Sequence, residues 1–309
     1  MHVWVLSQLV GSPGTERFLR AVDRAGHRAT LLHPLDVGLE LGGPAPMHAG
    51  LDGRRPTRGV LVNGERTELP DVVFTRMGAA SPQAGLHVLL QLEALGVPVI
   101  NAPLPLWRAR DKVRSFQVLD AAGVPTPASV VLGRQLSAAA LERALGAPPW
   151  VLKAPEGTKG EAVFLVQDAA GLAALPADGA VPYVAQRFVP EARGADVRVM
   201  VVDGEARGAM RRHARGGDFR ANLALGGRAE AVDLDAGAEG LALAELAVRA
   251  CAAHGLVVAG VDLLESADGP LVIEVNGSPG FAGIEDATGL DLAGQVVELL
   301  TELLAARAS

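Results

Sequence analysis

The sequence contains a single cysteine, Cys251, among its 309 residues. One cysteine cannot close an internal disulfide, so nothing indicates a disulfide-stabilised secreted protein. Residues Met1–Leu9 show no basic region followed by a cleavage site, and we do not expect them to be a signal peptide. No apolar run reaches the roughly 18 residues that a membrane-spanning helix needs. These absences lead us to expect a cytoplasmic protein that does not enter a membrane.

The sequence also has fewer basic than acidic residues. The chain has 28 Lys and Arg against 35 Asp and Glu, which gives a formal net charge of −7. Non-specific nucleic-acid binding needs a basic surface, so we expect no direct nucleic-acid partner. Hydrophobic residues make up 49% of the chain, as is ordinary for a globular protein, and the length is sufficient for two or three packed modules.

The first part of the chain alternates short apolar runs with helical patterns. A helix at Glu16–Ala25 stands between two of the runs, and another at His87–Leu95 precedes the last. This strand–helix–strand order predicts a small parallel α/β module, which we place at residues 1–105. Its strands are expected at Val3–Leu9, Ala29–Leu32, Asp71–Thr75 and Val97–Asn101.

The remainder of the chain is predicted to form two further modules. A helix over Ala109–Ala122 opens a central module at 106–190, in which strands dominate. The C-terminal module, 191–309, begins with two strands that turn at Asp203-Gly204, a strong hairpin signal. It is expected to contain the long helix Ala238–His254 and the closing amphipathic helix Leu292–Ala306. The central strands are expected at Val130–Leu132, Trp150–Ala154, Ala162–Val166 and Tyr183–Phe188.

Two acids and an amide stand out in a second predicted hairpin. Residues 260–276, GVDLLESADGPLVIEVN, read as two apolar strands joined by a short turn. If the strands pair symmetrically about Asp268, Asp262 lies directly opposite Glu274 and shares its face of the sheet. Asn276 follows two residues later and joins that face.

These three side chains favour a site for a divalent cation. Like charges directly opposed on two strands are destabilising, which suggests a cation between them. Two carboxylates and an amide carbonyl are hard oxygen ligands that suit Mg²⁺ or Mn²⁺. Since Mg²⁺ completes its shell with phosphates and water, a nucleotide–metal site fits the set. A solvated hairpin face with incidental acids remains the alternative, and a register slip of one residue would remove the argument.

Lys153 ends a predicted strand just before the glycine-rich segment 156–160, EGTKG. The backbone N–H groups of such a loop can bind phosphate oxygens, with Lys153 supplying positive charge. The spacing is not that of a Walker A loop, and a plain turn is the alternative reading.

Three other polar elements are candidates for binding anions. The cationic stretch 211–222, RRHARGGDFRAN, contains arginines suited to bidentate binding of phosphate or carboxylate. Backbone amides of the loop 276–280, NGSPG, are candidates for a small carboxylate. Arg76 follows a strand of the first module, where open α/β sheets bind ligands. A solvated loop, a simple turn and a surface arginine are the respective alternatives.

Taken together and in order, these segments resemble the ATP-grasp superfamily, and within it the RimK-type α-L-glutamate ligases. The resemblance covers nearly the whole chain, and five loose motifs in the same order make it specific. The five motifs are 109–112 (ARDK), Lys153 with 156–160, Arg211-Arg212 with 217–222, 259–262 (AGVD) and 274–280 (EVNGSPG), and segment 73–78 (VFTRMG) of the first module also fits.

The resemblance implies an ATP-grasp fold of mixed α/β and α+β class. Residues 1–105 would be a Rossmann-like pre-ATP-grasp module, the central module a lid, and the C-terminal module an antiparallel sheet with the metal site. Lys153 and Arg220 are the expected catalytic residues, and Asp262, Glu274 and Asn276 the metal ligands. Expected nucleotide-binding residues are Lys112, Lys153, Gly157, Thr158, Gly160, Gln186, Arg187, Phe188, Val189, Asp196, Arg220 and Asn222. Expected substrate-binding residues are Arg76, Arg211, Arg212, Ser278 and Gly280.

The implied reaction is an ATP- and Mg²⁺-dependent (or Mn²⁺-dependent) ligation through an acyl phosphate. Glutamate is the expected amine, and a protein C-terminus or a glutamyl chain the expected acceptor, with a carrier protein or a cofactor as alternatives. A homo-oligomer is expected. Three positions depart from the family's pattern: Arg187 replaces a glutamate, Ala162 a glycine and Gly277 an alanine. Arg187 and Ala162 motivate a hypothesis of a different class, a non-catalytic ATP-binding regulatory module.

Overall fold

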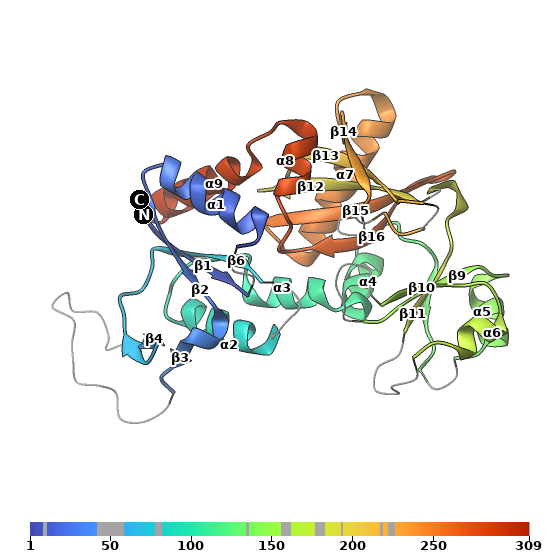
Figure 1. The fold of residues 1–309 in the computed structure, drawn as a ribbon, viewed down its shortest axis with the longest axis horizontal. Coiled ribbons are helices and arrows are strands. Elements are labelled where there is room, and N and C mark those ends of the chain that lie inside the picture. Colours follow the sequence, from blue (N-terminus) through green and yellow to red (C-terminus); the bar gives the residue numbers. More distant parts are fainter. Residues whose placement is uncertain are drawn as a thin grey trace. The chain divides into compact units, whose positions relative to one another are not determined.

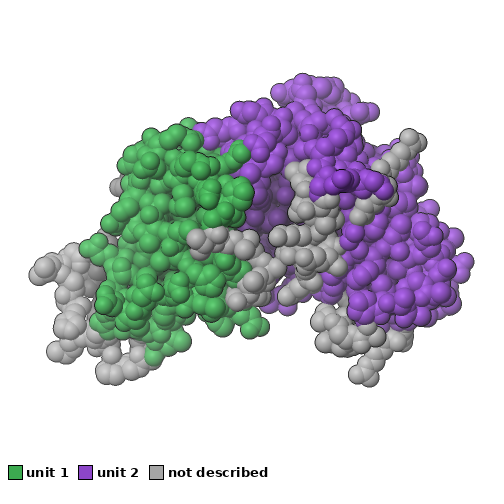
Figure 2. Space-filling model, in the orientation of Figure 1, with its two compact units in different colours: residues 1–104, 293–309 green, residues 105–292 purple. Residues whose placement is uncertain are grey.

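The computed structural model describes residues 1–8, 11–41, 59–77, 82–133, 136–155, 162–176, 183–192, 194–216, 219–221 and 226–308. The chain forms two compact units, which Figure 2 distinguishes by colour. Unit 1 comprises Met1–Leu104 with Ala293–Ser309, and unit 2 comprises Pro105–Leu292. The closing helix therefore belongs to the first unit, while the three-module division remains a prediction. None of the helices in the described part of the chain is long and apolar enough to cross a membrane.

Unit 1 is built on a four-stranded parallel sheet in the order β2-β1-β6-β7, so the predicted parallel α/β arrangement is correct (Figure 1). β1 is buried along its length because both faces of a parallel sheet are covered. Its strands are β1 (His2–Ser7), β2 (Arg28–Leu32), β6 (Val72–Arg76) and β7 (Val99–Ile100). Its helices are α1 (Pro13–Arg24), α2 (Pro82–Ala94) and α9 (Leu292–Ala308).

A small antiparallel sheet in unit 1 was not predicted. It pairs β3 (Val37–Leu39), β4 (Val60–Val62) and β5 (Glu65–Arg66), and a short 3₁₀ helix at Pro34–Asp36 precedes it. These strands have two or three residues each, too few to produce a periodic hydrophobic pattern.

The single helix predicted over Ala109–Ala122 is wrong. The structure has two helices, α3 (Pro103–Arg110) and α4 (Lys112–Ala121). Asp111 separates them as the N-cap of α4, where its Oδ1 accepts a hydrogen bond from the backbone N–H of Arg114 at 3.0 Å. This break puts Lys112 at the first position of α4.

The first sheet of unit 2 has the antiparallel order β10-β9-β11-β8. Its core contains Trp150, Leu152 and Ala185, which pack against Leu141 of helix α5. The strands are β8 (Ser129–Val131), β9 (Trp150–Lys153), β10 (Val163–Val166) and β11 (Val184–Arg187), and the helices are α5 (Ala138–Leu145) and α6 (Ala169–Ala173).

The second sheet of unit 2 has the antiparallel order β14-β13-β12-β15-β16. The predicted Asp-Gly hairpin is correct: Asp203 and Gly204 join β12 to β13 with φ angles of 51° and 74°. Strand β14 and helix α8 were not predicted. The strands are β12 (Ala195–Val202), β13 (Glu205–His213), β14 (Arg228–Val232), β15 (Val258–Ser266) and β16 (Gly269–Asn276), and the helices are α7 (Gly237–His254) and α8 (Ala282–Thr288). A 3₁₀ helix at Pro190–Ala192 connects the two sheets along the chain.

Alternation along β12 gives this second sheet one apolar and one polar face. Val197, Val199 and Val201 belong to the same buried core as the inner residues of α7. Asp196 and Arg198 alternate with these valines and therefore lie on the other face. The face away from α7 is thus free to carry charged side chains, and the candidate site lies there.

Candidate active site

The register of the β15–β16 hairpin places Asp262 opposite Glu274, as predicted. Near the turn the register is shifted by one residue from a hairpin symmetric about Asp268: Ser266 pairs with Gly269 and not with Pro270. A β-bulge at Ile273 then adds one residue to β16 and restores the Asp262–Glu274 pair. The predicted pair is therefore correct, but the predicted symmetry of the whole hairpin is wrong.

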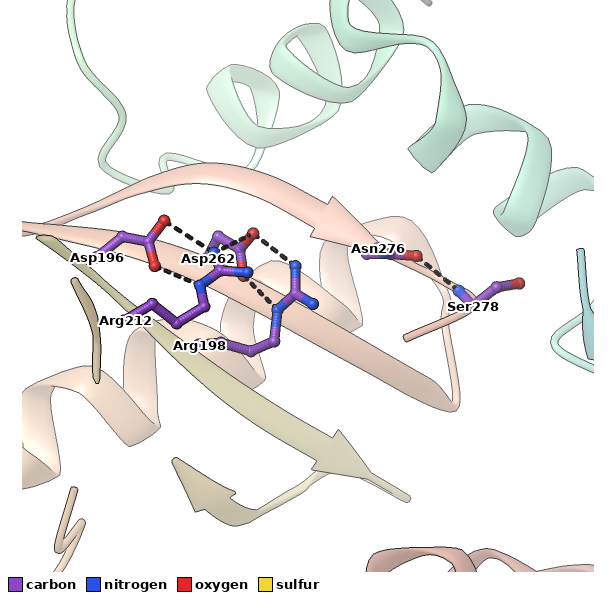
Figure 3. Close-up of polar contacts among 6 residues, drawn as sticks. All are labelled: Asp196, Arg198, Arg212, Asp262, Asn276 and Ser278. Carbon is purple, nitrogen blue, oxygen red and sulfur yellow. Dashed lines mark hydrogen bonds and ion pairs between the residues drawn. The ribbon is translucent and has the colours of Figure 1, made fainter. Parts of the chain in front are cut away.

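Four charged side chains on β12, β13 and β15 form one ion-pair network, which we call the charge quartet (Figure 3). Arg198 holds both carboxylate oxygens of Asp262, with Nε–Oδ1 at 2.6 Å and Nη2–Oδ2 at 2.7 Å. Arg212 holds both oxygens of Asp196 in the same bidentate way, at 2.6 and 2.8 Å. Nη2 of Arg212 also lies 2.8 Å from Oδ2 of Asp262 and so joins the two pairs.

The register of the sheet explains the quartet. Asp196 is the cross-strand partner of Arg212 on β13, and Arg198 is the cross-strand partner of Asp262 on β15. Directly opposed residues lie close enough for their side chains to interact, and oppositely charged pairs stabilise the sheet. The two carboxylates and two guanidinium groups balance in charge.

Burial and pairing shift the two acids in opposite directions. Burial would raise the pKa of Asp262, but the guanidinium groups of Arg198 and Arg212 outweigh it and hold that pKa below its usual range. Burial, reinforced by the charge of Asp262, raises the pKa of Asp196 despite its pairing with Arg212. The pKa of Arg212 is raised, because its two carboxylate partners outweigh the effect of its burial.

A cavity of about 180 Å³ lies beside the quartet, between the two sheets of unit 2. Lys153 of β9 and Glu274 of β16 line it from the two sheets, and Lys112 lines it from the start of α4. Both a cationic and an anionic group therefore reach this cavity. Of the predicted site residues, the cavity is lined by Lys112, Lys153, Gln186, Arg187, Phe188, Val189, Asp196, Arg212, Arg220, Asp262 and Glu274.

Several predicted site residues lie elsewhere. Arg211, next to Arg212 on β13, pairs with Glu265 at 2.6 Å and does not line the cavity. Arg76 ends β6 in unit 1, where burial lowers its pKa to about 10. Asn276, Ser278 and Gly280 are not among the lining residues. Gly157, Thr158, Gly160 and Asn222 lie outside the described residues.

Arg198 is a site residue that the sequence analysis missed. Its partner Asp262 is 64 positions away, so no local pattern connects them. The signal that could have found it is the spacing of Asp196 and Arg198, two residues apart on one face of a predicted strand.

Asp262, Glu274 and Asn276 offer oxygen atoms suited to a divalent cation, but only part of the expected negative charge is available to attract it. Asp262 is already balanced by two arginines, so its repulsion with Glu274 does not by itself require a cation. Glu274 is exposed and makes no ion pair with any other described residue. Oδ1 of Asn276 accepts one hydrogen bond, from the N–H of Ser278 at 2.9 Å, and keeps a second lone pair. No group of three His, Cys, Asp or Glu side chains that could hold a metal ion is found among the described residues, and Asp262, Glu274 and Asn276 remain the predicted ligands.

Comparison with solved structures gives the fold first. An ATP-grasp ligase, PsnB, in complex with a minimal precursor, Mg and ADP aligns with 98% of each chain at a TM-score of 0.69 and 22% identity. A D-alanine–D-alanine ligase from Bacillus anthracis aligns with 99% of this chain and 97% of its own at a TM-score of 0.70 and 17% identity. The predicted ATP-grasp fold is thereby confirmed.

Sequence comparisons give the family. Residues 1–105 match a RimK PreATP-grasp domain and residues 109–300 a RimK-like ATP-grasp domain. A probable alpha-L-glutamate ligase from Xanthomonas oryzae pv. oryzae is 36% identical over 98% of both chains. The chain belongs to the RimK-like ATP-grasp family. The predicted resemblance is confirmed, and with it the enzyme class, an ATP-grasp ligase.

Proposed function

We propose that this chain uses ATP and Mg²⁺ to join glutamate to a carboxylate, with a protein C-terminus or a glutamyl chain as acceptor. The observation that carries the proposal is the cavity in which Lys112 and Lys153 face the acids Asp262 and Glu274. The similarity of this chain to proteins named probable alpha-L-glutamate ligase, at 34–36% identity over nearly the whole chain, supports glutamate as the amine.

The residues of the cavity suit a nucleotide. Lys112, Lys153 and Arg220 would attract phosphate oxygens. The side-chain amide of Gln186 donates to Oγ of Ser129, and the N–H of Arg187 donates to the carbonyl of Ala128. These two donors are already used within the protein, so the base would be held by the packing surface and the backbone groups of Phe188 and Val189.

A cation would be held by Asp262, Glu274 and Asn276. When bound there, Mg²⁺ neutralises charge on phosphate oxygens. The acceptor carboxylate takes the γ-phosphoryl group of ATP, which releases ADP and leaves an acyl phosphate. The amine of glutamate then displaces phosphate, loses a proton and forms the amide. The protein supplies position and charge, and no covalent protein nucleophile is needed.

The experiment is a ligation assay with cell extract as the source of acceptor. Purified enzyme, ATP, Mg²⁺ and labelled glutamate are incubated with extract, and mass spectrometry identifies the labelled species. We expect label on a carboxylate-bearing acceptor, together with ADP release that depends on glutamate. Equal turnover with lysine, or none with glutamate, contradicts the assignment. Tight ATP binding without turnover on any acceptor would favour a non-catalytic ATP-binding module instead.

The affinity for ADP is expected to fall as the pH rises from about 7 to about 9. Burial lowers the pKa of Lys153 to about 8, partly countered by the charge of Glu274, so the ammonium group loses its proton within this range. The phosphate site then loses one positive charge. Calorimetric titration with ADP at a series of pH values measures the fall.

Lys153→Arg is the matched control, because a guanidinium group stays charged throughout this range. The variant should show a much flatter pH dependence of ADP affinity. If wild type and variant lose affinity in parallel, Lys153 is not the group that titrates.

A further inference from the structure

Arg198 leaves Asp262 little freedom. Its two nitrogens hold both carboxylate oxygens, and Arg212 donates a further contact to Oδ2. Of the roughly four lone-pair positions on a carboxylate, three are occupied, and the remaining one is on Oδ1. Asp262 can therefore offer a cation a single oxygen in a fixed orientation.

The fold makes room for this arrangement at Gly260. A Cβ atom there would lie 3.6 Å from Cδ and Nε of Arg198 and 3.0 Å from Cβ of Pro279. Gly260 is the cross-strand partner of Asn276 and lies two residues before Asp262. The stem of Arg198 thus passes over the strand between Asp262 and the loop that follows Asn276, as Figure 3 shows.

The charge quartet also cancels the charge of Asp262. Two carboxylates and two guanidinium groups leave no net charge, and all four are largely buried, so solvent screens them poorly. Among the described cation-site candidates, Glu274 alone contributes a carboxylate that no ion pair balances. Lys153 lines the same cavity and its charge interacts with that of Glu274, so a cation without nucleotide meets little net negative charge.

We propose that Arg198 is a positioning residue that fixes the Asp262 carboxylate and cancels its charge, so that a divalent cation binds tightly only together with phosphate oxygens. This inference rests on the proposed nucleotide–metal function of the same cavity. Under this inference the protein determines the order in which nucleotide and cation bind. The cation arrives with the nucleotide, or it is retained by the negative charge that the bound nucleotide provides.

A merely structural role for Arg198 predicts the opposite sign. If Arg198 only held the strands together, its removal would loosen the site and weaken cation binding. If it cancels charge, its removal leaves the quartet with one net negative charge and strengthens the binding of a cation alone.

The test measures Mn²⁺ binding by electron paramagnetic resonance, with and without ADP, in folded full-length protein. We expect Arg198→Gln to bind Mn²⁺ alone at least ~10-fold more tightly than wild type. Arg198→Lys is the matched control, because it keeps the charge but has only one nitrogen. It should bind Mn²⁺ alone as wild type does, yet show a lower kcat because Asp262 is no longer held at both oxygens.

The outcomes separate this inference from the proposed function. If wild type binds Mn²⁺ with ADP, but Arg198→Gln binds Mn²⁺ alone no more tightly than wild type, the inference is overturned and the function stands. If wild type binds no Mn²⁺ even with ADP, the proposed function fails, and the inference with it.

A second variant covers the case in which Arg198→Gln does not fold. Asp196→Asn leaves the quartet with one net positive charge, and it should weaken Mn²⁺ binding in the presence of ADP by ~10-fold. Unchanged binding in that variant overturns the inference.

Discussion

Replacing Glu274 by glutamine is expected to lower the rate of glutamate ligation at least ~100-fold, because it removes the one cavity carboxylate that no described ion pair balances. Glutamine has nearly the same shape, so the sheet should be retained. The measurement is kcat for glutamate-dependent ADP release, with thermal unfolding to confirm that the variant is folded.

Glu265→Gln is the matched control for this experiment. Glu265 lies on the same hairpin as Glu274, but it pairs with Arg211 and does not line the cavity. Its substitution should change kcat by less than about twofold and stability by less than about 1 kcal/mol. Similar losses in the two variants would mean that the hairpin as a whole, and not the cavity carboxylate, is required.

Replacing Arg212 by methionine is expected to lower the free energy of unfolding by about 3–5 kcal/mol. Arg212 is buried and bonded to both Asp196 and Asp262, and its loss leaves two buried acids with one arginine. Methionine retains the apolar part of the arginine side chain, so the loss of stability reports on the missing guanidinium group. Chemical denaturation at neutral pH measures the loss.

Arg211→Met provides the control at the neighbouring position. Arg211 is only partly buried, and its pair with Glu265 is accessible to solvent, so about 0–1 kcal/mol is expected. Equal losses in the two variants would contradict the claim that Arg212 acts through a buried network.

The loss of unfolding free energy caused by Arg212→Met should become smaller as the pH is lowered from about 7 to about 5. The pKa of Asp196 is already raised in the folded protein, and without Arg212 it rises further. A carboxyl group with a raised pKa costs stability in full while it is ionised in the folded protein, and this cost declines as the pH falls from the raised pKa toward the ordinary value of 3.8. A deficit that stays constant over this range would argue against ionised Asp196 as its cause.

The sequence was sufficient for the main elements of the fold and for part of the site. Long or strongly alternating segments, such as β12, β15 and α7, carry enough apolar residues to determine their own structure. The pairing of Asp262 with Glu274 followed from the hairpin pattern. It was obtained with an incorrect turn register, which the bulge at Ile273 compensates, and a bulge leaves no reliable trace in apolar periodicity.

The parts that escaped prediction depend on contacts between distant segments. Whether Arg198 meets Asp262 is decided by which strands become neighbours, and β12 and β15 are separated by β13, β14 and α7 along the chain. Strand β14 is stabilised by pairing with the edge of β13. Its largely exposed residues show little hydrophobic alternation that could have predicted a strand. The break between α3 and α4 was readable in principle, since Asp111 is a favoured N-cap residue.

The most direct test is a crystal structure grown with ADP and Mn²⁺, with anomalous diffraction used to locate the cation. We predict a Mn²⁺ peak within coordination distance of Asp262 and Glu274, and ADP phosphates beside Lys153. Nucleotide bound away from the cavity, or Mn²⁺ bound without either carboxylate, would contradict the account.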